Sequence, residues 1–160
     1  MENYKTILAL DLGTVAGWAL HDKSGGITSG TIDFKPNKFE GGGMVFLRFR
    51  QWLVDLKNSE DGFDEVYFEA VRSHKGIDAA HKYGGFVAHL MAFCEHHQIP
   101  YRGVPVGTIK KHITGKGNAT KYDVIEAIKK KGFKPIDDNE ADSLALMDYV
   151  LAKYGKGITL

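Results

Sequence analysis

The sequence predicts an α/β fold in which a mixed sheet is flanked by helices. The segment Ile7–Asp11 is a continuous apolar run without alternation, as in a strand that is covered on both faces. Two further strand candidates follow it directly, separated by short turns. Beyond them, helical and strand patterns alternate along the chain, which is typical of parallel strands joined by helices.

Length and composition are those of one globular domain spanning residues 1–160. The chain of 160 residues is long enough to bury a core, and 43% apolar with 26% charged residues is ordinary for such a domain. No apolar run approaches the roughly 20 residues that a membrane span needs, and the N-terminus lacks signal-peptide features, so we expect no membrane partner. The lone Cys94 excludes an internal disulfide and favours a reducing cytoplasm.

The first third of the chain predicts three antiparallel strands and then a helix. After the first strand, residues 17–21 form the second strand, residues 22–26 a glycine-containing hairpin turn, and residues 27–34 the third strand. Residues 44–56 carry apolar side chains at helical spacing and are expected to pack on the sheet.

The rest of the chain predicts two more strands and four helices. Glu65–Ala70 is the fourth strand, and the helix before it implies a right-handed crossover that places it parallel to the first strand. The remaining elements are a long helix at 77–97, a strand at 101–106, helices at 107–113 and 122–131, and a last helix beginning near Asp137. In the long helix we place Ala79, Ala80 and Cys94 on the buried side. The pair Gly84-Gly85 indicates close packing against another element.

Two carboxylates lie at the ends of strands that we expect to be parallel. Asp11 ends the first strand and Glu69 comes near the end of the fourth, so both should lie at the carboxyl edge of the sheet, where active sites of open α/β sheets occur. A carboxylate in an apolar strand costs several kcal/mol unless a cation compensates it. Glu69 alone would be an ordinary solvated residue, but together with Asp11 it indicates a functional site.

The last helix supplies further acids. Asp142 lies inside this helix and shares a face with Asp138, four residues earlier. Asp137 is explained by helix capping. Glu140 should point elsewhere, unless the helix begins close to it. We therefore expect Asp11, Glu69 and Asp142 to converge, with Asp138 or Glu140 as a fourth catalytic carboxylate.

A cluster of like charges is unfavourable unless cations neutralise it. All-oxygen ligands suit Mg²⁺, with Mn²⁺ as a substitute. Two such ions about 4 Å apart can activate a water and stabilise the leaving oxygen in phosphodiester hydrolysis. We predict two ions per active site and no small organic cofactor.

The charges are distributed unevenly along the chain. Residues 70–134 contain 12 Lys and Arg against 4 Asp and Glu, whereas the remainder contains 9 against 16, giving +8 and −7. This asymmetry suits a protein that acts on a polyanion through bound cations, although ordinary scatter of surface lysines would also produce it. The glycine- and lysine-containing loop 114–121 can cradle phosphates but lacks the spacing of a nucleotide P-loop. The candidate nucleic-acid contacts are Arg72, His74, Lys75, Lys82, Lys110, Lys111, Lys116 and Lys121.

Four motifs give the chain a resemblance to a known family. They are Asp11-Leu12-Gly13-Thr14, Phe68-Glu69, the block at 108–121 and Ala141-Asp142-Ser143-Leu144-Ala145. With them, nearly the whole chain resembles RuvC-type Holliday junction resolvases of the retroviral-integrase/RNase H superfamily, most closely the shorter bacteriophage forms. The resemblance implies an RNase H-like mixed five-stranded sheet, a homodimer, and Mg²⁺-dependent paired nicking of four-way DNA junctions in a prokaryotic or phage-infected cell.

By residue, the resemblance assigns Asp11, Glu69 and Asp142 to metal binding. It assigns Lys110 and Lys121 to backbone contact or to stabilisation of transition-state charge. For the dimer we expect contacts along the long helix around Tyr83-Gly84-Gly85.

Two departures from the family pattern bear on mechanism. Asn139 occupies the position, three residues before Asp142, where the family has Asp or His, so Asp138 or Glu140 is the candidate for the fourth ligand. The family also has an aromatic wedge after the second acidic strand, whereas the loop 72–77 holds no aromatic side chain except His74. Without a wedge, activity on branched DNA more broadly is expected.

Three other functions were weighed. Asp-x-Gly-Thr also occurs in actin-like ATPases and sugar kinases, but these need two such domains. A non-catalytic branched-DNA-binding module would not need the three acids, and an RNase H-like enzyme cutting RNA–DNA hybrids would differ only in substrate. Zinc binding is disfavoured because the histidines lack cysteine partners in a metal-site spacing.

Overall fold

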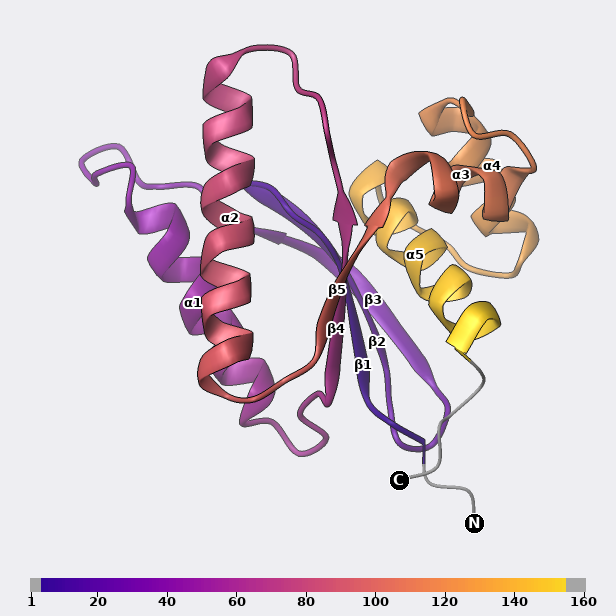
Figure 1. The fold of residues 1–160 in the computed structure, drawn as a ribbon, viewed down its shortest axis with the longest axis horizontal. Helices are drawn as coiled ribbons and strands as arrows, with labels where there is room; N and C mark the ends of the chain where they lie inside the picture. The colour runs from indigo at the N-terminus through magenta and orange to yellow at the C-terminus, as the bar shows by residue number, and fades with distance from the viewer. Residues whose placement is uncertain (1–3, 155–160) are drawn as a thin grey trace.

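The computed structural model describes residues 4–154 and contains a five-stranded sheet covered by helices on both faces (Figure 1). The strands are β1 (Ile7–Asp11), β2 (Val15–His21), β3 (Ile27–Asp33), β4 (Glu65–Ala70) and β5 (Tyr101–Pro105). The helices are α1 (Met44–Lys57), α2 (Ile77–His96), α3 (Val106–Thr114), α4 (Lys121–Lys130) and α5 (Asp138–Tyr154).

The strand order is β3-β2-β1-β4-β5. β1 pairs with β2, and β2 with β3, in antiparallel register, whereas β1 with β4 and β4 with β5 are parallel. The predicted fold class is therefore confirmed, including the parallel pairing of the first and fourth strands. β1 is central because its residues Ile7 to Leu10 are buried on both faces, as a run without alternation requires.

Each face of the sheet has its own hydrophobic core. Leu8 and Leu10 of β1 pack under α1 and α2, and Ile7 and Ala9 pack under α3, α4 and α5. Figure 1 shows these two helical layers on opposite sides of the sheet. Because side chains alternate along a strand, the next residue after Leu10, Asp11, continues the face that α5 covers.

Most element boundaries differ from the predicted ones by one or two residues. α4 begins at Lys121 because Thr120 and Asp123 form a reciprocal capping box around its first turn. β2 begins at Val15 rather than at residue 17, because its first residues pair with the end of β3.

The long helix differs from the prediction on its buried side. Cys94 is buried as expected, but Ala79 and Ala80 are exposed. Their exposure has a simple cause, since the first turns of α2 project beyond the end of the sheet (Figure 1). Gly85 packs against Phe46 of α1, where an added Cβ would lie 2.6 Å from the ring, whereas an added Cβ at Gly84 would meet no atom within 4 Å.

Within residues 4–154, no helix combines the length and the hydrophobicity needed to cross a bilayer.

Candidate metal centre

Three carboxylates from three separate segments meet at the carboxyl ends of β1 and β4. One ligand oxygen each from Asp11, Glu69 and Asp142 lies within 4.8 Å of the other two. Among the described residues, this is the only group of three or more acidic, histidine or cysteine side chains whose ligand atoms come so close. The histidines of α2 form no such group within residues 4–154.

The strand register explains how the first two acids meet. Leu10 pairs with Phe68, so Asp11 and Glu69 occupy the next position on two adjacent parallel strands. In-register neighbours in a parallel pair point to the same side of the sheet, which here is the side that carries α5. Asp142 then reaches them from the second turn of α5.

A glycine allows α5 to come close enough. An added Cβ at Gly17 of β2 would lie 1.9 Å from the backbone carbonyl oxygen of Asn139 and 2.3 Å from its carbonyl carbon. Backbone atoms cannot move aside as a flexible side chain can, so any other residue at position 17 would push the start of α5 away from the sheet. Gly17 therefore controls the position of Asp142 without touching the cluster, and only the unusual closeness of the two backbones reveals its role.

Two side-chain hydrogen bonds fasten the start of α5 to β3. The Ser29 hydroxyl donates to Glu140 Oε2 at 2.8 Å, and the Thr31 hydroxyl donates to Asp137 Oδ1 at 2.8 Å. Glu140 Oε1 also accepts from the backbone N–H of Ile136 at 3.1 Å. These bonds hold the helix in the orientation that directs Asp142 toward β1 and β4.

The contacts of Glu140 correct one alternative drawn from the sequence. Glu140 is buried and its carboxylate is directed to β3 and to its own helix start, away from the three acids. Within α5, Glu140 and Asp142 lie about 200° apart around the axis, so they cannot both face the cluster. Asp138, four residues before Asp142, is the fourth acidic residue beside the cluster.

Burial and repulsion among the carboxylates dominate the electrostatics of the cluster. Burial, and then the charges of Glu69 and Asp142, hold the pKa of Asp11 well above its usual value. Burial, with the Glu69 and Asp138 carboxylates, raises the pKa of Asp142 to about 7. Burial likewise raises the pKa of Glu69, against the opposing effects of a hydrogen bond with Asp11 and of the Lys110 and Lys121 charges.

Asp138 is in a different electrostatic state. Its carboxylate forms an ion pair with Lys121 Nζ at 2.9 Å. The hydrogen bond within this ion pair lowers the pKa of Asp138 and raises the pKa of Lys121. Asp138 is therefore ionised beside three carboxyl groups that resist ionisation.

The acids open into a hollow of about 470 Å³ between the starts of α2, α4 and α5. Several predicted site residues line it: Asp11, Glu69, His74, Lys82, Lys121, Asp138 and Asp142. Lys110 is close enough to lower the pKa of both Glu69 and Asp142. Tyr83, which the sequence predicts only as part of the dimer contact, also lines this hollow.

Tyr83 fixes the end of β4. Its hydroxyl donates to the backbone carbonyl of Glu69 at 2.7 Å and accepts from the Val71 N–H at 3.0 Å. The His74 ring lies against the Tyr83 ring with centroids 4.8 Å apart. His74 Nε2 is buried and has no hydrogen-bond partner among the described residues. An aromatic pair on the α2 side thus faces the acids.

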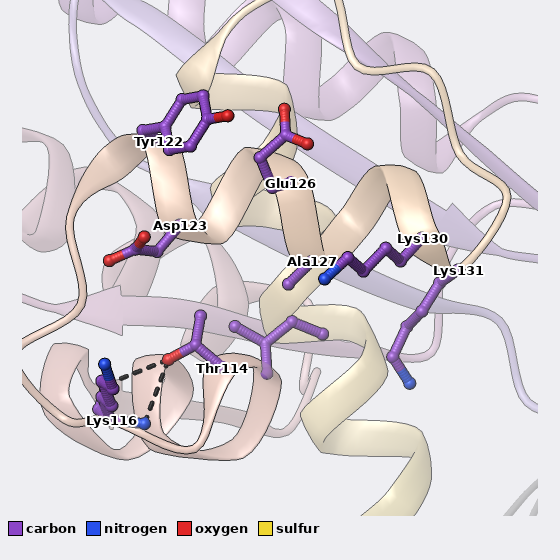
Figure 2. Close-up of a pocket in the computed structure, with 9 residues that line it drawn as sticks. Thr114, Lys116, Tyr122, Asp123, Glu126, Ala127, Lys130 and Lys131 are labelled. Atoms are coloured by element: carbon purple, nitrogen blue, oxygen red, sulfur yellow. Dashed lines mark hydrogen bonds between the residues drawn. The ribbon is translucent and has the colours of Figure 1, made fainter.

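Four other predicted contacts lie outside this hollow. Arg72 lines a neighbouring hollow formed with the start of α3, and Lys75 and Lys111 are exposed elsewhere. Lys116 lines another hollow, of about 570 Å³, between α3 and α4 (Figure 2). That hollow is larger than the acidic one but contains Asp123 and Glu126 among its lysines, and neither belongs to a cluster of metal ligands. The smaller, acidic hollow is therefore the candidate site.

Comparison with known proteins gives a fold neighbour at near-complete coverage. No protein-family model matches the chain, and no curated protein matches its sequence. The structure of RuvC from Thermus thermophilus matches 97% of this chain and 99% of its own with a TM-score of 0.69 and 19% identity. RuvC from the same organism in complex with a Holliday junction substrate gives a TM-score of 0.72 at 19% identity, covering 98% and 99%.

A more distant protein has the same architecture. The yeast mitochondrial Holliday junction resolvase Ydc2 matches 91% of this chain and 77% of its own, with a TM-score of 0.60 and 11% identity. The chain therefore has the RuvC fold, as its sequence motifs predict.

Proposed function

We propose that this chain is a divalent-metal-dependent endonuclease that resolves Holliday junctions and other branched DNA. The observation that carries the proposal is the convergence of Asp11, Glu69 and Asp142 at the carboxyl edge of the sheet. Its support comes from the fold, which is shared with a RuvC whose structure contains a Holliday junction and with a junction resolvase. Residues 1–160 would form the single nuclease domain.

The donor set fits Mg²⁺ or Mn²⁺. Its ligands are carboxylate oxygens only, which hard divalent cations prefer. Burial raises the pKa values of the three acids, and the nearby lysine side chains do not neutralise them, as expected of a site that binds divalent cations. When bound, two Mg²⁺ ions would supply an activated water and charge stabilisation at the scissile phosphate.

The protein's own groups have distinct roles in this proposal. Asp11, Glu69 and Asp142 would hold the metal ions through their carboxylate oxygens, which rigid strands and a helix keep in position. Asp138 would join them by giving up its ion pair with Lys121. Lys121 would then be free to stabilise, together with Lys110, the negative charge that develops on the phosphate.

The dimer is part of the same proposal. The exposed side of α2 at Gly84 leaves room for close approach of another helix, because no described atom lies within 4 Å of an added Cβ there. Gly85 does not contribute, since Phe46 of the same chain already occupies its surface. A homodimer would present two acidic hollows to the two opposed strands of a four-way junction.

The proposal is tested by substrate competition. Purified protein is incubated with a labelled four-way junction, a linear duplex and an RNA–DNA hybrid, in Mg²⁺ or in EDTA. We expect paired, metal-dependent nicks in the junction and little cleavage of the duplex. Cleavage of the hybrid alone would make the chain an RNase H-like enzyme. Tight junction binding without cleavage in Mg²⁺ or Mn²⁺ would make it a binding module.

The choice of Asp138 over Glu140 as fourth ligand has its own test. We expect Asp138→Asn to weaken Mg²⁺ binding about tenfold or more, because a neutral amide replaces an ionised ligand. Glu140→Gln should leave Mg²⁺ affinity nearly unchanged, although it weakens the bonds that hold the start of α5. Titration calorimetry at pH 8 measures both. Equal losses in the two variants would contradict the assignment.

A further inference from the structure

We propose that Phe39 stacks on a DNA base at the branch point of the substrate. This inference rests on the proposed function and names a contact that the acidic hollow itself does not supply. Phe39 is 93% exposed and is the most exposed large hydrophobic side chain among the described residues. Burial of a phenylalanine side chain is stabilising, and the isolated chain does not gain that stabilisation at Phe39.

The Phe39 loop, defined as residues 34–43, leaves the sheet beside the acidic site. The Phe34 N–H donates to the Thr14 carbonyl at 2.8 Å, and Thr14 ends the turn that follows Asp11. The path from Asp11 through Thr14 and Phe34 to Phe39 spans eight residue steps and one hydrogen-bonded crossing of about 5 Å, which together cannot exceed about 35 Å. Phe39 therefore lies within about one helical turn of DNA from the acids. Figure 1 shows this loop, in violet, projecting away from the sheet beside the start of α1, on the side opposite α5.

The loop is held in shape rather than left loose. The Asn37 N–H donates to Glu40 Oε1 at 2.6 Å, and the Glu40 N–H donates to the Asn37 carbonyl at 3.0 Å. Arg48 of α1 donates to Glu40 Oε2 at 2.7 Å and to the Lys35 carbonyl at 3.2 Å. This closed turn leaves Lys38 and Phe39 at its tip. A turn whose backbone is already closed loses little further backbone entropy when the side chain at its tip binds.

The charges around Phe39 favour nucleic acid over a second copy of the chain. Glu40 is neutralised by Arg48, and Lys38 Nζ lies 5.5 Å from the centre of the Phe39 ring. Neither Lys35 nor Lys38 forms an ion pair with any residue from 4 to 154. Protein interfaces are depleted in lysine, and one phenylalanine covers far less than the roughly 800 Å² per partner of a stable dimer. Unpaired lysines beside an aromatic ring are what single-stranded and unstacked bases bind.

The Phe39 loop also supplies an exposed aromatic side chain, which residues 72–77 of this chain lack. Residues 72–77 hold no aromatic side chain except His74, and His74 packs on Tyr83 inside the acidic hollow. A base that is unstacked at a branch point would instead find the Phe39 ring. Perfect linear duplex exposes no such base, so the contact would distinguish branched from linear DNA.

The test compares Phe39→Ala and Phe39→Trp with Leu47→Ala, which removes an exposed apolar side chain of α1 that is 57% exposed. Binding of a four-way junction and of a linear duplex is measured by fluorescence anisotropy in EDTA, which prevents cleavage. Junctions with 2-aminopurine beside the branch point report stacking directly. We expect Phe39→Ala to weaken junction binding about tenfold and to abolish the 2-aminopurine change, with duplex binding unaltered. Phe39→Trp should retain both signals, and Leu47→Ala should match wild type.

The opposite outcomes are distinct. Unchanged junction binding in Phe39→Ala, or an equal loss on linear duplex, would overturn the stacking contact while leaving the nuclease proposal intact. A smaller species for Phe39→Ala in analytical ultracentrifugation would make Phe39 a contact between copies and would also overturn it. Wild-type protein that neither binds nor cleaves the junction would refute the proposed function itself, and this inference with it.

Discussion

Asp11→Asn is expected to lower the rate of junction cleavage by about 10³-fold or more. The ligand oxygens of Asp11, Glu69 and Asp142 all lie within 4.8 Å of one another, and the charges of Glu69, Asp142 and Asp138 all act on Asp11. The substitution removes a negative charge from the ligand set and leaves an amide that binds Mg²⁺ poorly. Stabilisation of the transition state by bound metal contributes several kcal/mol, and each 1.36 kcal/mol corresponds to a factor of ten in rate.

The rate should be measured under single-turnover conditions with saturating protein, so that cleavage rather than product release is observed. Asp61→Asn is the matched control, because Asp61 is an exposed acid in the loop before β4, at the opposite end of that strand from Glu69. Junction affinity in EDTA should be equal or higher in Asp11→Asn, since one acid fewer repels the DNA. A loss of cleavage in Asp61→Asn of similar size, or cleavage by Asp11→Asn within tenfold of wild type, would refute the role of Asp11.

Sequence reasoning located the elements and the three acids because both follow from local rules. An apolar run ending in Asp11, and a crossover helix before Glu69, suffice to place two carboxylates at one edge of the sheet. The spacing of Asp138 and Asp142 likewise follows from the helical repeat. None of these placements depends on which helix packs on which strand.

The features that were not predicted depend on contacts between segments far apart in the chain. The approach of Gly17 to Asn139 joins β2 to α5 across more than 120 positions, and the pattern around Gly17 reads only as a strand. The direction of Glu140 depends on Ser29 of β3 in the same way. The sequence predicts Tyr83 only as part of the dimer contact of the long helix, and the path of β4 is what brings its hydroxyl to the backbone carbonyl of Glu69. Such long-range contacts are set by tertiary packing rather than by propensity.

Asp142→Asn should stabilise the metal-free protein at pH 8, which is the opposite of what most substitutions of half-buried residues do. Burial and the neighbouring carboxylates raise the pKa of Asp142 to about 7 in the folded state, above the usual value of 3.8. The folded state therefore binds the proton more tightly than the unfolded state. The stability that this provides is fully present below pH 3.8 and is lost as the pH rises to about 7. At pH 8 the wild-type cluster carries its full repulsion, and the amide removes part of it.

The expected gain for Asp142→Asn in EDTA at pH 8 is about 2 kcal/mol, after discounting the shift for partial solvent screening. For a chain of this size, that corresponds to a rise in melting temperature of about 6 °C. At pH 4 the two proteins should melt at nearly the same temperature. Differential scanning calorimetry at both pH values, with Asp61→Asn as the exposed control, measures these differences.

Saturating Mg²⁺ at pH 8 should reverse the order of stability. Wild-type protein gains about 2.7 kcal/mol when the ion is present at 100 times its dissociation constant, whereas Asp142→Asn has lost a ligand and gains much less. Because the ligands must be deprotonated to bind, Mg²⁺ affinity should also rise with pH up to about 7. If Asp142→Asn melts below wild type in EDTA at pH 8, the Asp142 carboxylate stabilises the metal-free fold. The cluster would then have a structural role, and the assignment as a metal-binding site would be contradicted.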